Sequence, residues 1–373
     1  MAIRIVPHAE PHRAAVDAFN LRMRAGGSPW GFYPDPVPDW IPPRAGATVW
    51  REYYLALEDT GEVRGAFALK PQVWLVRGRE CFVTDWQGPF SEGSVNPKLA
   101  TLGLRLVREM LKLRPCIYSW GHGGNEQPVV VMLEKMGWGM HPTPLCLRIV
   151  HPVRFLRGNG HLRSTAGRRF VLDALAFTGL GWLGIHALQA VRRWRHGGKS
   201  TATATEVPSF GPWADDLWQR HKDSYLAVAC RDMASMNDLA PATGWPPVVR
   251  LKIDRGGVVV GWALVMDTRM KDDPRYGSLR VGSIVDCFAA PADAGDVVAA
   301  ATRFLEARGV DLIASNQAHP GWVAGFRSQG YTILPGKRLF APSPALRELL
   351  APFDDTARGL HLTNMDGHGP MGF

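Results

Sequence analysis

Three side chains that can transfer protons stand at or just after expected strands in the first third of the chain. Asp85 ends the apolar run that begins at Phe82, Tyr118 lies in a later β-rich run, and His122 follows it in the glycine-rich turn 121–125. A carboxylate, a phenol and an imidazole are groups that serve as general acids or bases. Structural roles are the alternative, with Asp85 paired to loop amides and His122 solvated. The sequence has no G-x-S-x-G, Walker-type or H-E-x-x-H pattern, which disfavours hydrolase, nucleotidase and zinc-protease chemistry.

Composition is that of an ordinary folded chain. Of 373 residues, 46% are hydrophobic and 21% are charged, which excludes disordered, fibrous and multi-span membrane classes and suggests two to three domains. The five cysteines form no C-x-x-C pair, so we expect no disulfide framework and no zinc cluster, but a reducing compartment. The first ten residues hold no apolar signal core, so a cytoplasmic location without a bound metal is the expectation.

Two stretches that flank residues 151–207 repeat one order of landmarks. In each, a hairpin with an Asp–Gly turn is followed by a strand that ends in aspartate, a helix, a strand leading to asparagine, and a helix that ends in glycine and an aromatic residue. Matched positions, such as Asp85 and Asp286 or Gly137 and Gly330, are 191 to 201 residues apart. A nearly constant offset indicates an internal repeat. We therefore expect an α/β protein with two tandem units, 1–150 and 208–373, joined by the helical linker 151–207.

The linker carries nearly all of the excess positive charge. The net charge is +9, and nine basic residues but one acid, Asp173, lie between His151 and Ser200. They flank the apolar run 170–191, a pattern that fits a helix on an anionic membrane surface through residues 154–199. The alternatives are a helix docked on the domains with its arginines solvated, or a membrane span, which interior polar and glycine residues disfavour. The rest of the chain is close to neutral, so nucleic acid is not an expected partner.

The order of elements and two local motifs resemble the GNAT acyltransferase family. Residues 125–138 (NEQPVVVMLEKMGW) look like the family's helix that ends in Tyr-Glu-Lys-Leu-Gly-Phe, and Val95-Asn96-Pro97 looks like the Val-x-Pro that closes its fourth strand. Two such units occur in one chain in mycothiol synthase-like and Fem-type transferases, which this sequence therefore also resembles. The resemblance implies mixed, mainly antiparallel sheets flanked by helices, and acetyl-CoA or another acyl-CoA as co-substrate.

In GNAT enzymes the acyl-CoA lies between the fourth and fifth strands, with its pyrophosphate on free amides at the start of the next helix. The resemblance places Lys98, Thr101 and Gly103 at that position in the first half, although only Gly103 fits the family motif. Alternatively, Asn96 caps the helix early and Gly103 packs in mid-helix. Asn125 is either a helix cap or a ligand to the amide arm of the donor.

The second half has two acids, Asp293 and Asp296, where a pyrophosphate would bind. We expect Asp293 to cap the helix and the pair to satisfy its free amides. The second unit is therefore predicted to be a degenerate copy that does not bind acyl-CoA.

For acyl transfer to an amine, the resemblance makes Asp85 the candidate base. The tyrosine that often serves as acid in the family is replaced by Leu133 in the first half and by Phe326 in the second. Tyr118 or His122 would substitute for it, the thiolate would leave unassisted or through water, or the site is not catalytic.

The loop 28–43 is the candidate acceptor region. It holds six prolines and four aromatic residues, so it is stiff and offers flat apolar faces. The aromatic candidates for substrate contact are Trp30, Phe32, Tyr33 and Trp40, and the alternative is that they close the core. The glycine-rich tail 361–369 is expected to be loosely ordered and matches no metal motif.

The sequence thus predicts an acyl-CoA-dependent N-acyltransferase of the acetyltransferase type. Its acceptor would be a small-molecule, lipid-linked or sugar-linked amine, such as a cell-envelope or polysaccharide precursor, and the protein would be peripheral at the inner face of the membrane. The alternatives are a Fem-type transferase that uses aminoacyl-tRNA and a non-catalytic binding or scaffold protein.

Overall fold

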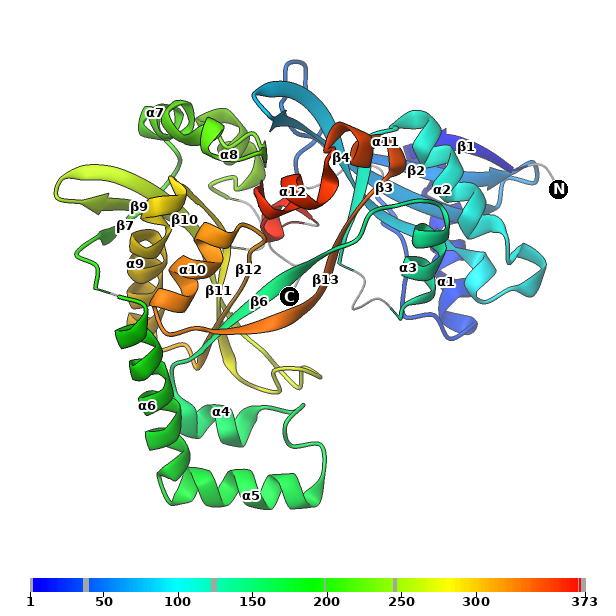
Figure 1. The fold of residues 1–373 in the computed structure, drawn as a ribbon. Helices are drawn as coiled ribbons and strands as arrows, with labels where there is room; N and C mark the ends of the chain where they lie inside the picture. Colours follow the sequence, from blue (N-terminus) through cyan, green and yellow to red (C-terminus); the bar gives the residue numbers. More distant parts are fainter. Residues whose placement is uncertain are drawn as a thin grey trace.

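Both halves of the chain build the same succession of strands and helices, and all strands join one mixed sheet (Figure 1). The computed structural model describes residues 3–35, 40–121, 126–197, 199–243, 247–367 and 369. The first half comprises β1 (Ile3–Pro7), α1 (Arg13–Ala25), β2 (Glu52–Glu58), β3 (Val63–Val76), β4 (Arg79–Ser91), α2 (Leu102–Leu113), β5 (Ile117–Gly121), α3 (Pro128–Lys135) and β6 (His141–Ile149).

The linker comes next, and the second half then repeats the order of the first half with additional short strands and helices. The linker forms α4 (Pro152–Gly158), α5 (Ala166–Phe177) and α6 (Leu180–Arg195). The second half comprises β7 (Thr203–Val207), α7 (Pro212–His221), β8 (Ala227–Ala229), α8 (Met233–Leu239), β9 (Val249–Arg255), β10 (Val258–Arg269), β11 (Arg280–Ala289), α9 (Ala294–Ala307), β12 (Leu312–Asn316), α10 (Pro320–Ser328), β13 (Thr332–Pro342), α11 (Pro344–Leu349), α12 (Phe353–Arg358) and β14 (Leu360–His361).

Strand pairing confirms the duplication predicted from the sequence. In the first half, β1, β2, β3 and β4 pair antiparallel in that order, and β4 pairs parallel with β5. In the second half, β7, β9, β10 and β11 do the same, and β11 pairs parallel with β12. Because β7 pairs with β9, the sheet of the second half begins at Thr203, before the boundary expected at residue 208.

The two halves exchange their last strands. β6 of the first half pairs with β12, and β13 of the second half pairs with β5, while β6 and β13 pair with each other at the centre of the sheet. The strand order is therefore β1-β2-β3-β4-β5-β13-β6-β12-β11-β10-β9-β7. Neither 1–150 nor 208–373 contains all the strands of its own sheet, so the halves fold as one body.

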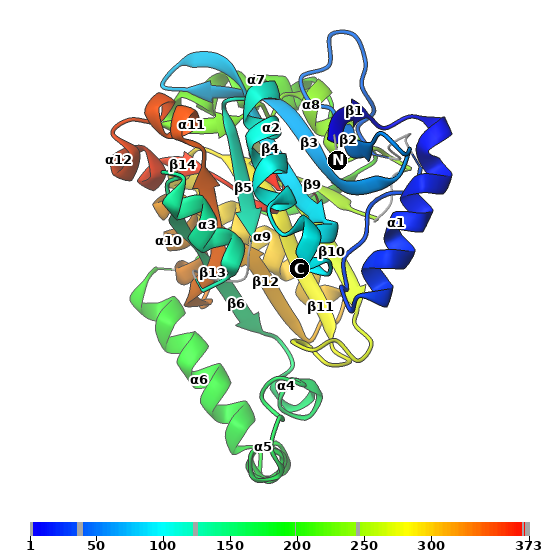
Figure 2. The same cartoon turned by 90° about the vertical axis from the view of Figure 1, so that its right-hand side faces the viewer.

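Helix α2 covers one face of the first-half sheet and illustrates how sequence places these elements. Its buried side chains, Leu102, Leu106, Val107 and Met110, recur at helical spacing and form one apolar stripe. They pack with Leu69 and Trp86 of β3 and β4. α1 packs on the same half through a separate cluster around Val16 and Phe19, which includes residues of β2 and β3, and Figure 2 shows the two helices apart from each other on this half.

The C-terminal segment 360–367 lies in the interior between the two halves, so the expectation of a loosely ordered tail is wrong. Every residue from Leu360 to Asp366 is at most 1% exposed. β14 pairs parallel with β8, and β8 also pairs with β3 of the first half. The segment therefore bridges strands from both copies.

Candidate functional site

The two central strands of the first half separate at Asp85 and Tyr118. β4 and β5 are paired only at Thr84 with Ile117 and at Asp85 with Tyr118. Beyond this point β4 continues to Ser91 beside β3, whereas β5 turns to pair with β13. β4 also carries a bulge around Gly88, where its register against β3 shifts, and such bulges bend a strand. The two strands therefore diverge beyond Asp85 and Tyr118.

The open end of these strands faces the start of α2. Asn96 caps a short 3₁₀ turn (Pro97–Leu99), its side chain accepting from the Lys98 amide at 3.1 Å, and the α-helix itself begins later, at Leu102. Gly103 is thus in the first turn of α2 and not in mid-helix. Thr101 occupies the N-cap position, but its side chain makes no capping hydrogen bond. The first amides of an α-helix lack intrahelical partners, so this end can receive an anion.

Lys98, Thr101 and Gly103, predicted to bind the donor, come together at this helix end. Lys98 and Thr101 are exposed. A Cβ atom added to Gly103 would meet only Pro89 and Ser91, at 3.9 Å. Both distances are ordinary van der Waals contacts, so no protein atom crowds Gly103 at the first turn.

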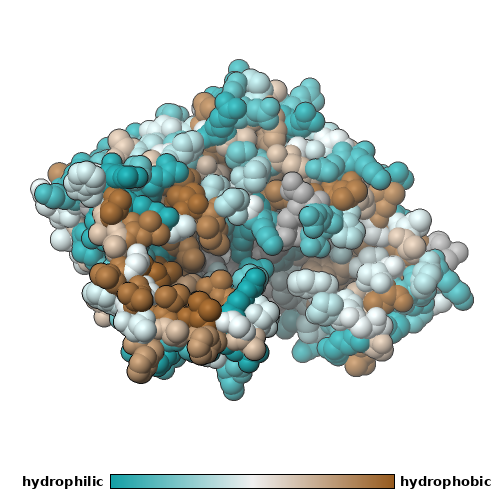
Figure 3. Space-filling view, turned by 60° about the horizontal axis from the view of Figure 1, so that its bottom comes forward, coloured by the Kyte–Doolittle hydropathy of each residue, from teal (hydrophilic) through white to brown (hydrophobic). Residues whose placement is uncertain are grey.

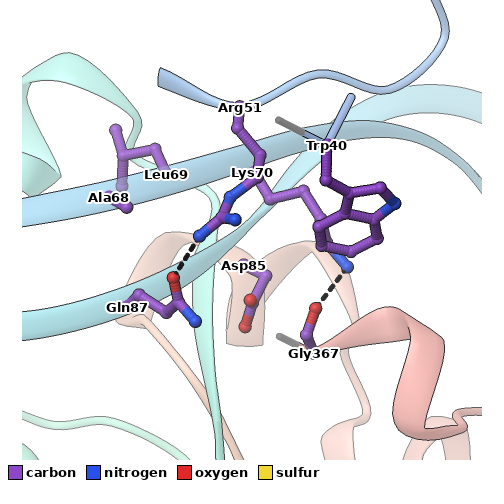
Figure 4. Close-up of a pocket in the computed structure, with 8 residues that line it drawn as sticks. All are labelled: Trp40, Arg51, Ala68, Leu69, Lys70, Asp85, Gln87 and Gly367. Carbon is purple, nitrogen blue, oxygen red and sulfur yellow. Dashed lines mark hydrogen bonds between the residues drawn. The ribbon is translucent and has the colours of Figure 1, made fainter. Parts of the chain in front are cut away.

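Asp85 lies in a buried polar cluster with Lys70. The two residues are opposite each other on β4 and β3, and their side chains are only 2% and 3% exposed. Burial lowers the pKa of Lys70 to about 8, an effect that the nearby carboxylates of Asp85 and Asp366 oppose. Figure 4 shows both side chains at a narrow pocket that has no room for a water-sized molecule. A carboxylate at the point where two strands diverge can accept a proton from a group bound between them.

The C-terminal segment closes the far side of this pocket. The Lys70 ammonium donates to the backbone oxygens of Met365 at 2.6 Å, Asp366 at 2.8 Å and Gly367 at 2.5 Å. The Tyr118 hydroxyl donates to the Asp366 backbone oxygen as well. Burial raises the pKa of Tyr118 well above its usual value. Tyr118 is thus beside Asp85, and its hydroxyl is already hydrogen-bonded to the C-terminal segment.

Arg51, at the start of the hairpin, organises the mouth of the pocket. Its guanidinium lies over the rings of Tyr33 and Trp40, at 5.2 and 5.5 Å, and donates to Gln87 of β4. Tyr33 also donates to Gln87 at 3.3 Å. Of the four predicted acceptor-binding aromatics, Trp40 lines the pocket near the Lys70 ammonium (Figure 4). Tyr33 contacts Arg51 and Gln87 at its mouth.

The other two aromatics of the loop 28–43 do not join the pocket. Phe32 is 4% exposed and packs edge-on against Tyr53 in the core under α1, so its expected contact with substrate is wrong. The side chain of Asn20 fixes it there by bonding both its amide and its carbonyl, at 2.7 and 2.8 Å. Trp30 is 68% exposed. His122 and Asn125, predicted as catalytic and donor-binding residues, lie outside the described residues.

The matching helix end in the second half is occupied. α10 lies against the first turn of α9, where a Cβ added to Gly325 would be 2.9 Å from the Ala294 carbonyl carbon. Asp293 does not cap α9 with its side chain, contrary to expectation. Instead, Asp293 accepts from Arg255 at 2.8 Å and Asp296 binds the same guanidinium. Protein atoms and paired carboxylates thus fill the position that is open in the first half.

The counterpart of Asp85 is neutralised within the protein. Asp286 forms an ion pair with Arg231, Oδ2 to Nε 3.1 Å, and Arg231 also binds Asp366 at 2.7 Å. All three side chains are fully buried. Burial raises the pKa of Asp286, although the guanidinium opposes the shift. This cluster ties β11 to the C-terminal segment and leaves no site for a ligand.

The sequence alone missed Lys70, Arg51 and the segment 365–367. One signal was present, because Lys70 is the single lysine in a strand that is otherwise almost entirely apolar, and a buried lysine needs specific partners. Nothing local to residues 365–367 indicates that they pack against β3. Among the described residues, no group of three or more His, Cys, Asp or Glu side chains could hold a metal ion.

Comparison with known proteins identifies the fold. No protein-family model and no curated protein matches the sequence. Saccharomyces cerevisiae N-myristoyltransferase with bound myristoyl-CoA is similar in structure, with a TM-score of 0.53 and 9% identity over 91% of this chain and 82% of that chain. A probable N-acyltransferase of Enterococcus faecalis gives a TM-score of 0.52 and 9% identity over 94% and 75%. The chain therefore has the two-unit GNAT fold, as predicted, and the finer resemblance to mycothiol synthase-like or Fem-type transferases stays a prediction.

Proposed function

We propose that the protein is an acyl-CoA-dependent N-acyltransferase whose first half binds the donor. The carrying observation is a difference between the two copies. The central strands diverge in both, but the helix end beyond them is packed against α10 in the second half, whereas a Cβ atom at Gly103 of the first half would meet only Pro89 and Ser91, at 3.9 Å. The likeness to N-myristoyltransferase, solved with myristoyl-CoA, supports an acyl-CoA donor for this fold.

In this proposal the pyrophosphate binds the first amides of α2 beside Thr101, with Lys98 adding a positive charge. The pantetheine arm runs between β4 and β5, so the thioester lies near Asp85. The acceptor amine attacks the thioester carbonyl carbon, Asp85 takes the amine proton, the C–S bond breaks, and the CoA thiolate is protonated by water. Because the Tyr118 hydroxyl already donates a hydrogen bond to the Asp366 backbone oxygen, it is not assigned as the acid.

The acceptor would enter past Tyr33, Trp40 and Arg51. Flat aromatic faces with a polar rim suit a sugar-linked or lipid-linked amine, so an envelope or polysaccharide precursor is our proposed acceptor class. A tRNA-dependent reaction is not favoured. Nearly all of the excess positive charge of the chain lies between residues 151 and 200, and Figure 1 shows the linker helices away from β3 and β4, which carry this pocket.

Titration calorimetry of the full chain with CoA tests the donor site. We expect one CoA per chain, and we expect Lys98→Glu to weaken binding at least tenfold. The matched control is Lys112→Glu, the same change at the other end of α2, where the side chain is 70% exposed; it should bind CoA normally.

Two results would contradict the proposal. Equal CoA affinity in Lys98→Glu and Lys112→Glu would show that the donor does not bind at the start of α2. Tight CoA binding without acyl transfer to any of a panel of amino sugars and amines would favour the non-catalytic alternative.

A further inference from the structure

Helices α5 and α6 expose an unusual number of large apolar side chains. Phe177 is 85% exposed, Trp194 83% and Phe170 76%. The other exposed large apolar residues on these two helices are Val171, Leu180, Trp182, Leu183, Leu188 and Val191. We call Ala166–Arg195 the α5–α6 arm. Contiguous exposed apolar surface of this kind marks an interaction site.

On α6 the apolar face is directed away from the protein. Leu180, Leu183, Val191 and Trp194 are spaced by 3, 8 and 3 residues, which places them on one face of a helix. The opposite face, which contacts the body, is polar: Gln189 is 7% exposed and donates to the Ile149 carbonyl at 2.9 Å, and Arg192 donates to Thr332. A helix that only covers a soluble domain would have these faces reversed. Helix α6 thus docks on the protein through these polar residues, whereas α4 and α5 pack through apolar ones, such as Phe155, Leu156 and Ala176.

Close packing holds the arm in this orientation. A Cβ added to Gly181 would lie 2.4 Å from Leu156 of α4, and one added to Gly330 would lie 2.9 Å from the Gln189 backbone oxygen. Gly179 takes the left-handed conformation, φ 74°, between the two helices, which are bent by 78°. The exposure of the apolar face is therefore a built feature of the fold.

The arm projects from the rest of the molecule. Figures 1 and 2 show α4, α5 and α6 together at one end, beyond the sheet. Figure 3, which brings this end forward, shows a broad hydrophobic area with hydrophilic side chains at its edges. No single described helix has the length and apolarity to cross a bilayer, and only the bent α5–α6 pair meets that criterion jointly.

The charges beside the apolar face have one sign. Exposed basic side chains on or next to the arm are Arg157, Arg168, Arg169, Arg193, Arg195 and Lys199. The one acid between residues 151 and 200, Asp173, is paired with Arg163 through two bonds of 2.7 and 3.0 Å. The arm therefore offers apolar area with an uncompensated positive rim.

We propose that the α5–α6 arm docks on an anionic lipid bilayer. The aromatic and leucine side chains would enter the boundary between headgroups and acyl chains, and the arginines would contact lipid phosphates. A second copy of the chain is a poorer occupant, because a symmetric contact places the same arginines opposite each other. The inference does not depend on the proposed transferase activity.

Vesicle flotation of the full chain tests this surface, with phosphatidylcholine vesicles compared with vesicles that also contain phosphatidylglycerol. We expect binding to the anionic vesicles only, and weakening at high salt, since the Debye length falls from about 10 Å at 0.1 M to about 3 Å at 1 M. Leu183→Gln with Trp194→Gln should lower the partition coefficient at least tenfold. Arg168→Glu should lower it roughly fivefold for each unit of charge changed.

Matched controls change exposed residues elsewhere. Leu21→Gln on α1, where Leu21 is 61% exposed, and Arg24→Glu, also exposed on α1, should leave partitioning unchanged. Absence of vesicle binding would overturn the proposal, as would equal binding to neutral vesicles. So would a concentration-dependent dimer, measured by sedimentation, that Leu183→Gln with Trp194→Gln abolishes, because a second copy would then be the occupant.

Discussion

Asp85 and Tyr118 are the last residues through which β4 and β5 are paired. Both side chains are buried, but their partners differ. The Tyr118 hydroxyl donates a hydrogen bond to the Asp366 backbone oxygen, and Asp85 lies opposite Lys70 on the neighbouring strand. A ligand that enters between the diverging strands ends at this pair. The roles of the two residues can therefore be separated by substitution.

Asp85→Asn keeps the size of the side chain and removes its ability to take a proton. We expect kcat for acyl transfer to fall by about 10²- to 10⁴-fold, with CoA affinity within about threefold of the parent's. The measurement is thiol release with acyl-CoA and amine, combined with CoA calorimetry. Unchanged kcat would leave Asp85 a structural residue, which is the alternative that the sequence left open.

Tyr118→Phe removes the hydrogen bond to the C-terminal segment. Because the phenol is engaged there, we expect a smaller effect on kcat, below tenfold, and a loss of about 1 kcal/mol in the free energy of unfolding. A hundredfold loss of kcat at unchanged stability would instead identify Tyr118 as the missing general acid.

Lys70 gives the stability a specific pH dependence. Its pKa is about 8 in the folded protein, against an ordinary value of 10.5, so between these values the unfolded chain binds more protons than the folded one. The free energy of unfolding therefore gains a contribution that rises with pH from about 8 to 10.5, by up to about 3 kcal/mol. Urea titrations at pH 8 and pH 10 should show this rise in the parent relative to Lys70→Met. An equal change in the free energy of unfolding between pH 8 and pH 10 in the two proteins would contradict this prediction.

Asp366 ties the C-terminal segment to the second half through Arg231, and its backbone oxygen accepts from Lys70 of the first half. Asp366→Asn leaves a fully buried guanidinium with one carboxylate partner in place of two, so we expect a loss of about 3 kcal/mol in the free energy of unfolding. Asp355→Asn, which weakens an exposed pair with Arg358 at 3.8 Å, should cost less than about 1 kcal/mol. Equal denaturation midpoints for the two variants would show that the buried cluster does not hold the segment.

The packing of α10 on α9 can be tested with two helix glycines. Gly325→Ala inserts a methyl group 2.9 Å from the Ala294 carbonyl carbon, so we expect destabilisation of about 1 to 3 kcal/mol and unchanged CoA affinity. In Gly184→Ala the new methyl group meets no atom within 4 Å, and alanine is the better helix former by up to about 1 kcal/mol. If Gly325→Ala altered CoA binding, the donor site would involve the second half.

The sequence alone determined the repeated unit, because landmarks such as Asp85 and Asp286 depend on local turns, caps and strand periods that repeat at a constant offset. It also gave the proline content from which a stiff loop 28–43 is expected, but it left open whether Gly103 lies near the helix start or in mid-helix, and the structure decided for the first turn. Only the tertiary structure decided the exchange of β6 and β13, since strand pairing between distant segments has no local signature. It likewise decided that Lys70 binds the segment 365–367 and that the apolar face of α6 is directed outward. Helical spacing fixes which residues share a face, but what that face meets depends on the packing of the whole chain.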